Sequence, residues 1–148
     1  MIPIHGPRPA STQVYRRRPG AYAILPLRGR VLLTFQSEPV PELQLPGGGL
    51  DPGEAPLRAL HREVREETGW TIGPARLLGR YRQYGYIPEY DMWAEKICSL
   101  YLARPVRQIS APQHAEHSVI WASPAKATQL LTNAGDRAFV RAVLMDGI

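Results

Sequence analysis

Between Gly48 and Trp70 the chain reads GGLDPGEAPLRALHREVREETGW, and this stretch says most about the fold. Pro56 lacks a backbone N–H and is tolerated only in a first turn, so its helix is expected to begin near Glu54 or Ala55. Gly69 is expected to end the helix in the left-handed conformation. Apolar or small residues recur between these limits at helical spacing, at Leu57, Leu60, Val64 and Thr68. The stretch therefore predicts a glycine-rich loop followed by an amphipathic helix.

Three acidic residues of this helix, Glu63, Glu66 and Glu67, are predicted to share one face. Residues three and four positions apart fall within an arc of about 100° on a helix. Carboxylates held this close together repel one another unless a cation lies between them. Carboxylate oxygens in this number suit Mg²⁺ or Mn²⁺, which keep waters and substrate phosphates in their remaining coordination positions. The pattern is therefore compatible with a divalent metal site.

A solvated helix surface explains part of the same pattern. Glu54–Arg58 and Arg62–Glu66 are pairs of opposite charge four residues apart, as on an ordinary exposed helix. Glu63–Glu67 has the same spacing but like charges, which such a surface does not favour. Helix geometry alone leaves the metal site and the solvated face equally supported.

The spacing of the stretch resembles the Nudix box of the Nudix hydrolase (MutT-like) family at every polar and glycine position. The shared positions run in order Gly48, Glu54, Arg62-Glu63-Val64, Glu66-Glu67 and Gly69. Trp70 stands where the family usually has an aliphatic residue, a difference that affects packing. The resemblance implies an α/β fold, an α/β/α sandwich with a mixed sheet between helices. It also implies a pyrophosphohydrolase that cuts a nucleoside diphosphate linked to another moiety.

The resemblance also implies roles for particular side chains. Glu63, Glu66 and Glu67 would bind Mg²⁺ or Mn²⁺, which lowers the pKa of a bound water and neutralises the diphosphate. Arg62 would orient these carboxylates by ion pairing, and Glu54 would tie the preceding loop to the helix. The proton acceptor is either a glutamate of the box, best matched by Glu63, or an acid nearer the C-terminus.

Residues outside the acidic cluster are candidates for catalysis and substrate binding. Glu116 lies in the C-terminal region where some family members carry a catalytic acid, although an exposed loop acid is the alternative. Gly48 and Gly49 would let the backbone approach a ligand closely. Tyr86 belongs to an aromatic-rich stretch, from which a ring could stack on a nucleobase. His114 and His117 flank Glu116 and are interpreted as part of a polar loop.

The identity of the substrate stays open between a nucleotide sugar, a dinucleoside polyphosphate and a nucleoside triphosphate. Gln36 stands where coenzyme A pyrophosphatases carry an arginine after Leu32-Leu33-Thr34, which argues against coenzyme A. Tyr86 and Pro88 lie near the markers of two other subfamilies and match neither. A second hypothesis is a catalytically silent domain that senses a nucleotide ligand or binds nucleic acid. Such domains typically lose box carboxylates, and this chain keeps them.

The rest of the chain predicts one domain over residues 20–148 after an irregular, proline-rich lead-in over residues 1–19. Strands are expected over residues 21–27, 30–35, 43–45, 75–86, 95–106 and 117–121, with a tight turn at residues 28–29. Two helices are expected near the C-terminus, over residues 124–131 and 135–145. Strands with helices between and after them favour a sheet packed between helices.

Composition sets the remaining expectations. The formal charge of +5 favours anionic partners, and the short run Arg16-Arg17-Arg18 is interpreted as a solvated face, so nucleic acid is not the expected partner. Cys98 is the one cysteine and is expected to be a buried thiol, not a nucleophile. Because no signal peptide or membrane span is recognisable, a cytoplasmic enzyme is expected. Homodimerisation is expected only on family grounds.

Overall fold

The computed structural model describes residues 2–146. Met1, the first residue of the expected lead-in, and residues 147–148, the end of the expected domain, lie outside the described residues. The strands are β1 (Arg16–Ile24), β2 (Pro26–Leu27), β3 (Arg30–Gln36), β4 (Glu42–Gln44), β5 (Gly47–Gly49), β6 (Trp70–Ile72), β7 (Arg76–Ile87), β8 (Met92–Leu102), β9 (Pro105–Gln108) and β10 (His117–Ala122). The helices are α1 (Pro56–Thr68), the 3-10 turn η1 (Pro88–Tyr90), α2 (Pro124–Leu130), α3 (Ala134–Val140) and the π-helical turn η2 (Arg141–Met145).

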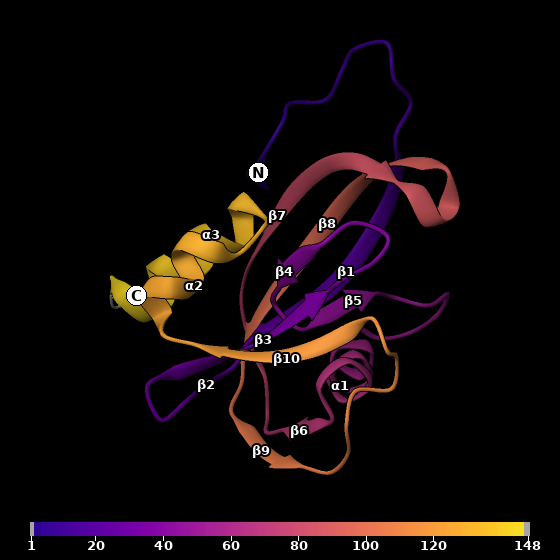
Figure 1. The fold of residues 1–148 in the computed structure, drawn as a ribbon. Coiled ribbons are helices and arrows are strands. Elements are labelled where there is room, and N and C mark those ends of the chain that lie inside the picture. The colour runs from indigo at the N-terminus through magenta and orange to yellow at the C-terminus, as the bar shows by residue number, and fades with distance from the viewer. Residues whose placement is uncertain (1, 147–148) are drawn as a thin grey trace.

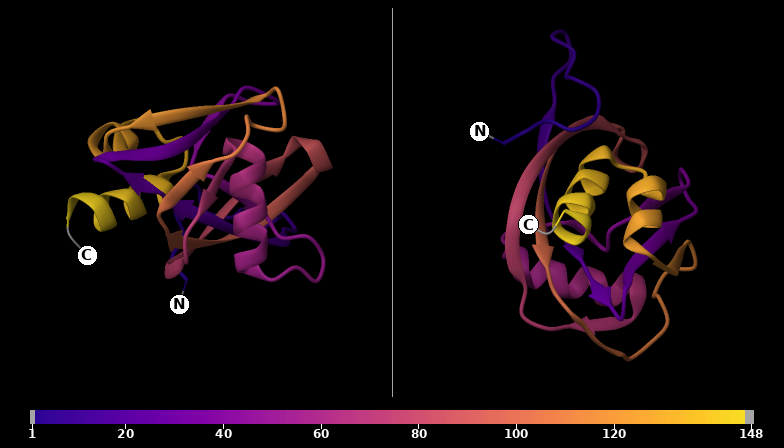
Figure 2. Two further views of the ribbon diagram at one scale, coloured as in Figure 1. Left: turned by 90° about the horizontal axis from the view of Figure 1, so that it is seen from below. Right: turned by 90° about the vertical axis from the view of Figure 1, so that its left-hand side faces the viewer.

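Two groups of strands, one mixed and one antiparallel, form the centre of the molecule (Figure 1). One sheet has the order β5-β1-β8-β7, in which β1 and β8 run parallel and the other pairs are antiparallel. The second has the order β10-β3-β2, with β4 also paired to β3. A third, two-stranded pairing joins β6 to β9. The views in Figure 2 show α1 on one side of these strands and α2 and α3 on the other.

Strand alternation explains why helices cover both sides. Ala21 and Ala23 of β1 are fully buried against Leu60 and Val64 of α1, whereas Ile24 belongs to the opposite cluster. That opposite cluster includes Leu100 of β8, Ala127 of α2 and Val140 of α3. Successive side chains of a strand point to opposite faces, so an apolar strand buried on both sides needs helices on both. The expected α/β/α sandwich is confirmed.

Helix α1 begins and ends where its sequence predicts, but one of its apolar residues is not in the core. Ala55 precedes the first turn, and Gly69 has φ 77° and donates its N–H to the carbonyl of Arg65. Leu60 and Val64 are fully buried, whereas Leu57 is 45% exposed. Leu57, expected on the apolar face of the helix, therefore lies outside the core, beside a surface hollow that is also lined by Arg58 and Arg65. Helical periodicity identifies a face but not how far the core extends along it.

Three strand boundaries differ from the expected ones. β1 begins at Arg16, so the last residues of the expected lead-in are already paired with β8. The expected strand over residues 95–106 is divided into β8 and β9, because β9 leaves the main sheet to pair with β6. Residues 47–49 form a strand rather than a loop, paired with β1. All three differences come from pairing with distant residues, which local patterns do not encode.

Other expectations hold. Arg28 and Gly29 have φ values of 51° and 78° and form the tight turn between β2 and β3. Cys98 is buried. Within the part of the chain that the structure describes, each helix is too short or too polar to cross a bilayer.

Candidate active site

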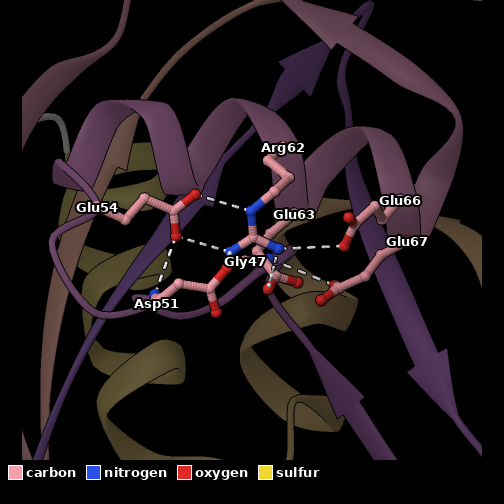
Figure 3. A network of polar contacts seen from close by, with 7 residues as sticks. All are labelled: Gly47, Asp51, Glu54, Arg62, Glu63, Glu66 and Glu67. Atoms are coloured by element: carbon pink, nitrogen blue, oxygen red, sulfur yellow. Dashed lines mark hydrogen bonds and ion pairs between the residues drawn. The ribbon is translucent and has the colours of Figure 1, made fainter.

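The acidic face of α1 is organised around one guanidinium (Figure 3). Arg62 donates from Nη1 to Glu63 at 3.0 Å and to Glu66 at 3.2 Å. Its other two nitrogens, Nε and Nη2, each donate to one oxygen of Glu54 at 2.8 Å. Hydrogen bonding to Glu54 raises the pKa of Arg62 further above its ordinary value, so Arg62 stays charged. Arg62 therefore holds three carboxylates in fixed positions relative to one another.

Glu54 joins this helix to the loop before it. Its carboxylate also accepts the backbone N–H of Asp51 at 3.0 Å. The hydrogen bond from Arg62 is the main reason why the pKa of Glu54 falls to about 2. Glu54 therefore remains ionised at any pH where the protein is expected to work, and it keeps the loop fixed to Arg62.

Glu67 is the most enclosed acid of the cluster. It is 6% exposed, and its Oε1 accepts the N–H of Gly47 at 3.3 Å. Burial, together with the neighbouring charge of Glu63, raises the pKa of Glu67 well above its ordinary value. Burial is also the main cause of the raised pKa of Glu63. Two carboxyl groups this close and this enclosed require a positive charge, either a proton or a cation, between them.

The glycines of β5 let the backbone come close to these acids. A Cβ on Gly48 would lie 2.6 Å from the carboxyl carbon of Glu63. Gly47 has φ 147°, and a Cβ there would lie 2.2 Å from the carbonyl oxygen of Ala21. A residue larger than glycine at either position would displace the carboxylate or the strand. The glycine run is thus explained by close approach to Glu63 and to β1.

A cleft of about 470 Å³ lies in front of the acidic cluster. Of the residues predicted from the sequence, the cleft is lined by Glu63, Glu66, Glu67, Gly48, Gly49 and Tyr86. Arg62 is not among the lining residues, and it contacts the cluster through Glu63 and Glu66. Tyr86 is 44% exposed and contacts Trp93 with ring centroids 5.3 Å apart.

Glu116 is not brought together with the other acids. It is absent from the lining of the cleft, and its backbone carbonyl accepts the N–H of Ser37 at 2.9 Å. Its neighbours His114 and His117 line the cleft instead. Burial lowers the pKa of His117, and its Nδ1 has no hydrogen-bond partner among the described residues. The two histidines, interpreted from the sequence as part of a polar loop, are thus nearer the candidate chemistry than Glu116.

Sequence reasoning also missed two cations of the cleft, Arg18 and Lys96. Arg18 belongs to the arginine run that was interpreted as a solvated face, and Lys96 lies in the middle of β8. The available signal was strand alternation, since within an arginine run that forms a strand every second side chain points to the same face.

The donor chemistry of the cluster fits a divalent cation. Glu63, Glu66 and Glu67 supply hard oxygen ligands on one wall of the cleft, and the raised pKa values of Glu63 and Glu67 show the demand for positive charge there. Across residues 2–146, however, no three metal-ligating side chains converge as a ready-made ligand set.

Comparison with known families identifies the domain. A model of the NUDIX domain matches residues 14–143, nearly the whole chain. The chain belongs to the Nudix family. The matched range includes α1, the glycine strand β5 and every residue of the acidic cluster.

Solved structures of Nudix proteins share the fold. The MutT NUDIX hydrolase from Burkholderia pseudomallei superposes with a TM-score of 0.70 at 25% identity, over 86% of this chain and 98% of that one. The MutT protein from Methanosarcina mazei Go1 gives a TM-score of 0.68 at 25% identity, over 88% of this chain and 95% of that one. The Nudix fold of this chain is therefore shared along most of its length.

Curated relatives match over shorter stretches. A putative 8-oxo-dGTP diphosphatase of Bacillus subtilis (strain 168) is 36% identical over 74 residues, which is 50% of this chain and 50% of that protein. An RNA pyrophosphohydrolase of Legionella pneumophila (strain Corby) is 44% identical over 41 residues, 28% of this chain and 23% of that protein. The match thus spans half or less of these relatives.

Proposed function

We propose that this Nudix domain is a pyrophosphohydrolase that uses Mg²⁺ or Mn²⁺ to hydrolyse a phosphoanhydride in a nucleoside diphosphate linked to another moiety. One observation supports this most directly: Glu63, Glu66 and Glu67 line a single cleft beside a strand of glycines. Water adds across the P–O–P bond: its oxygen bonds to one phosphorus, the bridging oxygen leaves with the other, and the two protons of the water pass to the product phosphates or to solvent.

Glu63, Glu66 and Glu67 are the residues that would hold the cation. A bound divalent ion supplies neutralisation of the diphosphate and activation of water for attack at phosphorus. The protein supplies position: Arg62 fixes Glu63 and Glu66, and the N–H of Gly47 fixes Glu67. Positioning and electrostatic stabilisation account for most of the catalysis in phosphoryl transfer.

Glu63 is the better-placed proton acceptor. Its side chain is 18% exposed and it lines the cleft. Glu116 lies outside the cleft lining. We therefore assign the proton acceptor to Glu63 and give Glu116 no part in the reaction.

The substrate class is proposed from the relatives and from the cleft together. The names of the two curated relatives refer to 8-oxo-dGTP, a nucleotide, and to RNA, a polymer of nucleotides. In the cleft, Tyr86 and Tyr90 offer exposed rings suited to stacking on a base. Nucleoside triphosphates, dinucleoside polyphosphates and nucleotide sugars all present the required diphosphate.

The experiment that tests the proposal is a substrate panel with a matched pair of variants. The purified protein is incubated with Mg²⁺ and each class of nucleotide, and released phosphate, diphosphate or nucleoside monophosphate is measured. Glu66→Gln should lower turnover at least a hundredfold while the thermal unfolding midpoint stays near that of the wild type. Glu116→Gln, a glutamate near but outside the cleft, should leave turnover within about threefold.

The competing hypothesis is a silent Nudix domain that binds a nucleotide without cutting it. Tight nucleotide binding with no product from any member of the panel would support it and contradict the proposal. Loss of turnover in Glu116→Gln equal to that in Glu63→Gln would move the proton acceptor away from Glu63.

A further inference from the structure

Arg18 and Lys96 lie side by side on the face of the β5-β1-β8-β7 sheet that borders the cleft, called the inner face below. They are register partners on the parallel strands β1 and β8, and both line the cleft. Neighbouring strands lie about 4.8 Å apart, so two positive side chains start from adjacent positions on one face. Like charges in directly opposed positions destabilise a sheet.

At the adjacent register position the two strands place opposite charges beside each other. Arg17 is paired with Glu95, and its Nε lies 3.2 Å from a carboxylate oxygen. Among the described residues, neither Arg18 nor Lys96 forms an ion pair, although Glu42 and Glu89 also line the cleft. On the opposite, outer face the charge of Arg17 is therefore paired with Glu95, whereas on the inner face neither Arg18 nor Lys96 has a salt-bridge partner among the described residues, although Lys96 attracts the buried Asp136 enough to lower its pKa.

Arg18 is also held in place rather than left free in solvent. Its guanidinium carbon lies 4.7 Å from the ring centroid of Tyr90, a cation–π contact that fixes its direction. A Cβ on Gly49 would lie 3.4 Å from Nη2 of Arg18, while a Cβ on Gly48 would meet Glu63. Two consecutive glycines of β5 therefore approach the cation on one side and the acidic cluster on the other.

We propose that Arg18 and Lys96 bind a phosphate group of the substrate that lies beyond the phosphoanhydride at the acidic cluster. The inference rests on the proposed function and narrows it. Substrates with a longer phosphate chain, such as nucleoside triphosphates and dinucleoside polyphosphates, are preferred over nucleotide sugars, whose second moiety is uncharged. Arginine and lysine side chains supply charge-assisted hydrogen bonds to phosphate oxygens, which are the stronger class of hydrogen bond.

The first test measures binding without turnover. Inorganic tripolyphosphate is titrated calorimetrically into the wild type, Arg18→Gln, Lys96→Gln and the control Arg17→Gln, with and without Mg²⁺. Each of the first two variants should raise the dissociation constant about tenfold or more. Arg17→Gln removes the same charge from the outer face and should change it less than about threefold, which separates a local contact from a change in net charge. Circular dichroism and thermal unfolding confirm that each variant is folded.

The second test measures selectivity. The ratio of kcat/KM for a nucleoside triphosphate to kcat/KM for a nucleotide sugar should fall in Arg18→Gln and Lys96→Gln, and it should stay unchanged in Arg17→Gln. Unaltered tripolyphosphate binding in both inner-face variants would overturn the inference and leave the hydrolase proposal standing. The inference would also be overturned if the two variants bound an unphosphorylated nucleoside as much more weakly as they bind tripolyphosphate, because the pair would then recognise the base. Conversely, an inactive protein that binds tripolyphosphate through Arg18 and Lys96 would refute the hydrolase and keep the anion site.

Discussion

Arg62 and Glu54 form a two-armed ion pair in which Nε and Nη2 each donate to one carboxylate oxygen at 2.8 Å. The third nitrogen of the same guanidinium, Nη1, remains available and donates to Glu63 and Glu66. Only a planar side chain with several donors can serve all three carboxylates at once. The pair therefore connects the loop before α1 to the acids that face the cleft.

The first prediction concerns Arg62→Lys, which keeps the positive charge but removes the forked guanidinium with its three donating nitrogens. An ammonium group cannot reproduce the two parallel bonds to Glu54 while also contacting Glu63 and Glu66, so the acids lose their fixed positions. Turnover should fall about tenfold to a hundredfold and the free energy of unfolding by about 1–3 kcal/mol. Nucleotide hydrolysis and thermal unfolding check both. Arg65→Lys, an exposed position of the same helix, is the control; equal effects at the two positions would show that the fork is irrelevant.

The second prediction concerns Gly48→Ala. The added methyl would lie within 2.9 Å of all three carboxyl atoms of Glu63 and would push this side chain out of place. Misplacement by about 1 Å in an active site costs about a hundredfold in rate, so turnover should fall by that order while the fold persists. Gly85→Ala on β7 is the matched control, because a Cβ there meets nothing within 4 Å. Normal turnover in Gly48→Ala would show that Glu63 has room to move without consequence.

Local rules made the acidic helix predictable. Pro56 and Gly69 set its ends, and the order of Glu63, Glu66 and Glu67 places them together whatever else the chain does. These features depend on residues within a few turns of one another. The same holds for the tight turn at Arg28 and Gly29.

Features that depend on pairing between distant strands were not predictable. The arginine run became informative only once β1 was seen to begin at Arg16, because alternation then sends Arg17 outward and Arg18 into the cleft. Lys96 joins Arg18 through the parallel register of β1 and β8, which no local pattern specifies. For the same reason His117 reached the cleft whereas Glu116 did not.

The third prediction uses the apolar residues of α1, where periodicity and structure disagree. Leu60→Ala empties a fully buried position and should lower the free energy of unfolding by about 2–5 kcal/mol. Leu57→Ala, at a position that is 45% exposed, should change it by less than about 1 kcal/mol. Urea denaturation of the two variants measures the difference directly. Similar losses would mean that the first turn packs more deeply than described.

The fourth prediction concerns the pH dependence of stability through Asp136. This residue is 2% exposed in the first turn of α3, and its Oδ1 accepts the hydroxyl of Tyr81 at 2.8 Å. Burial is the main cause that raises its pKa from the ordinary 3.8 to about 6. The folded protein therefore keeps the proton between these pH values while the unfolded chain loses it, so this group stabilises the fold fully at low pH. That contribution is lost as pH rises from about 4 through 6.

Asp136→Asn isolates this effect, because an amide keeps an oxygen for Tyr81 and does not titrate. Between pH 4 and pH 7, the unfolding free energy of the wild type should fall by about 2 kcal/mol relative to that of Asp136→Asn. Urea denaturation at a series of pH values gives this difference, and all other titrating groups cancel in it. A difference that stays constant with pH would show that Asp136 has the same affinity for protons in the folded and unfolded chain. A shift in favour of the wild type would mean that a cation compensates the ionised carboxylate, and Lys96 on β8 is the cation whose attraction already lowers the pKa of Asp136.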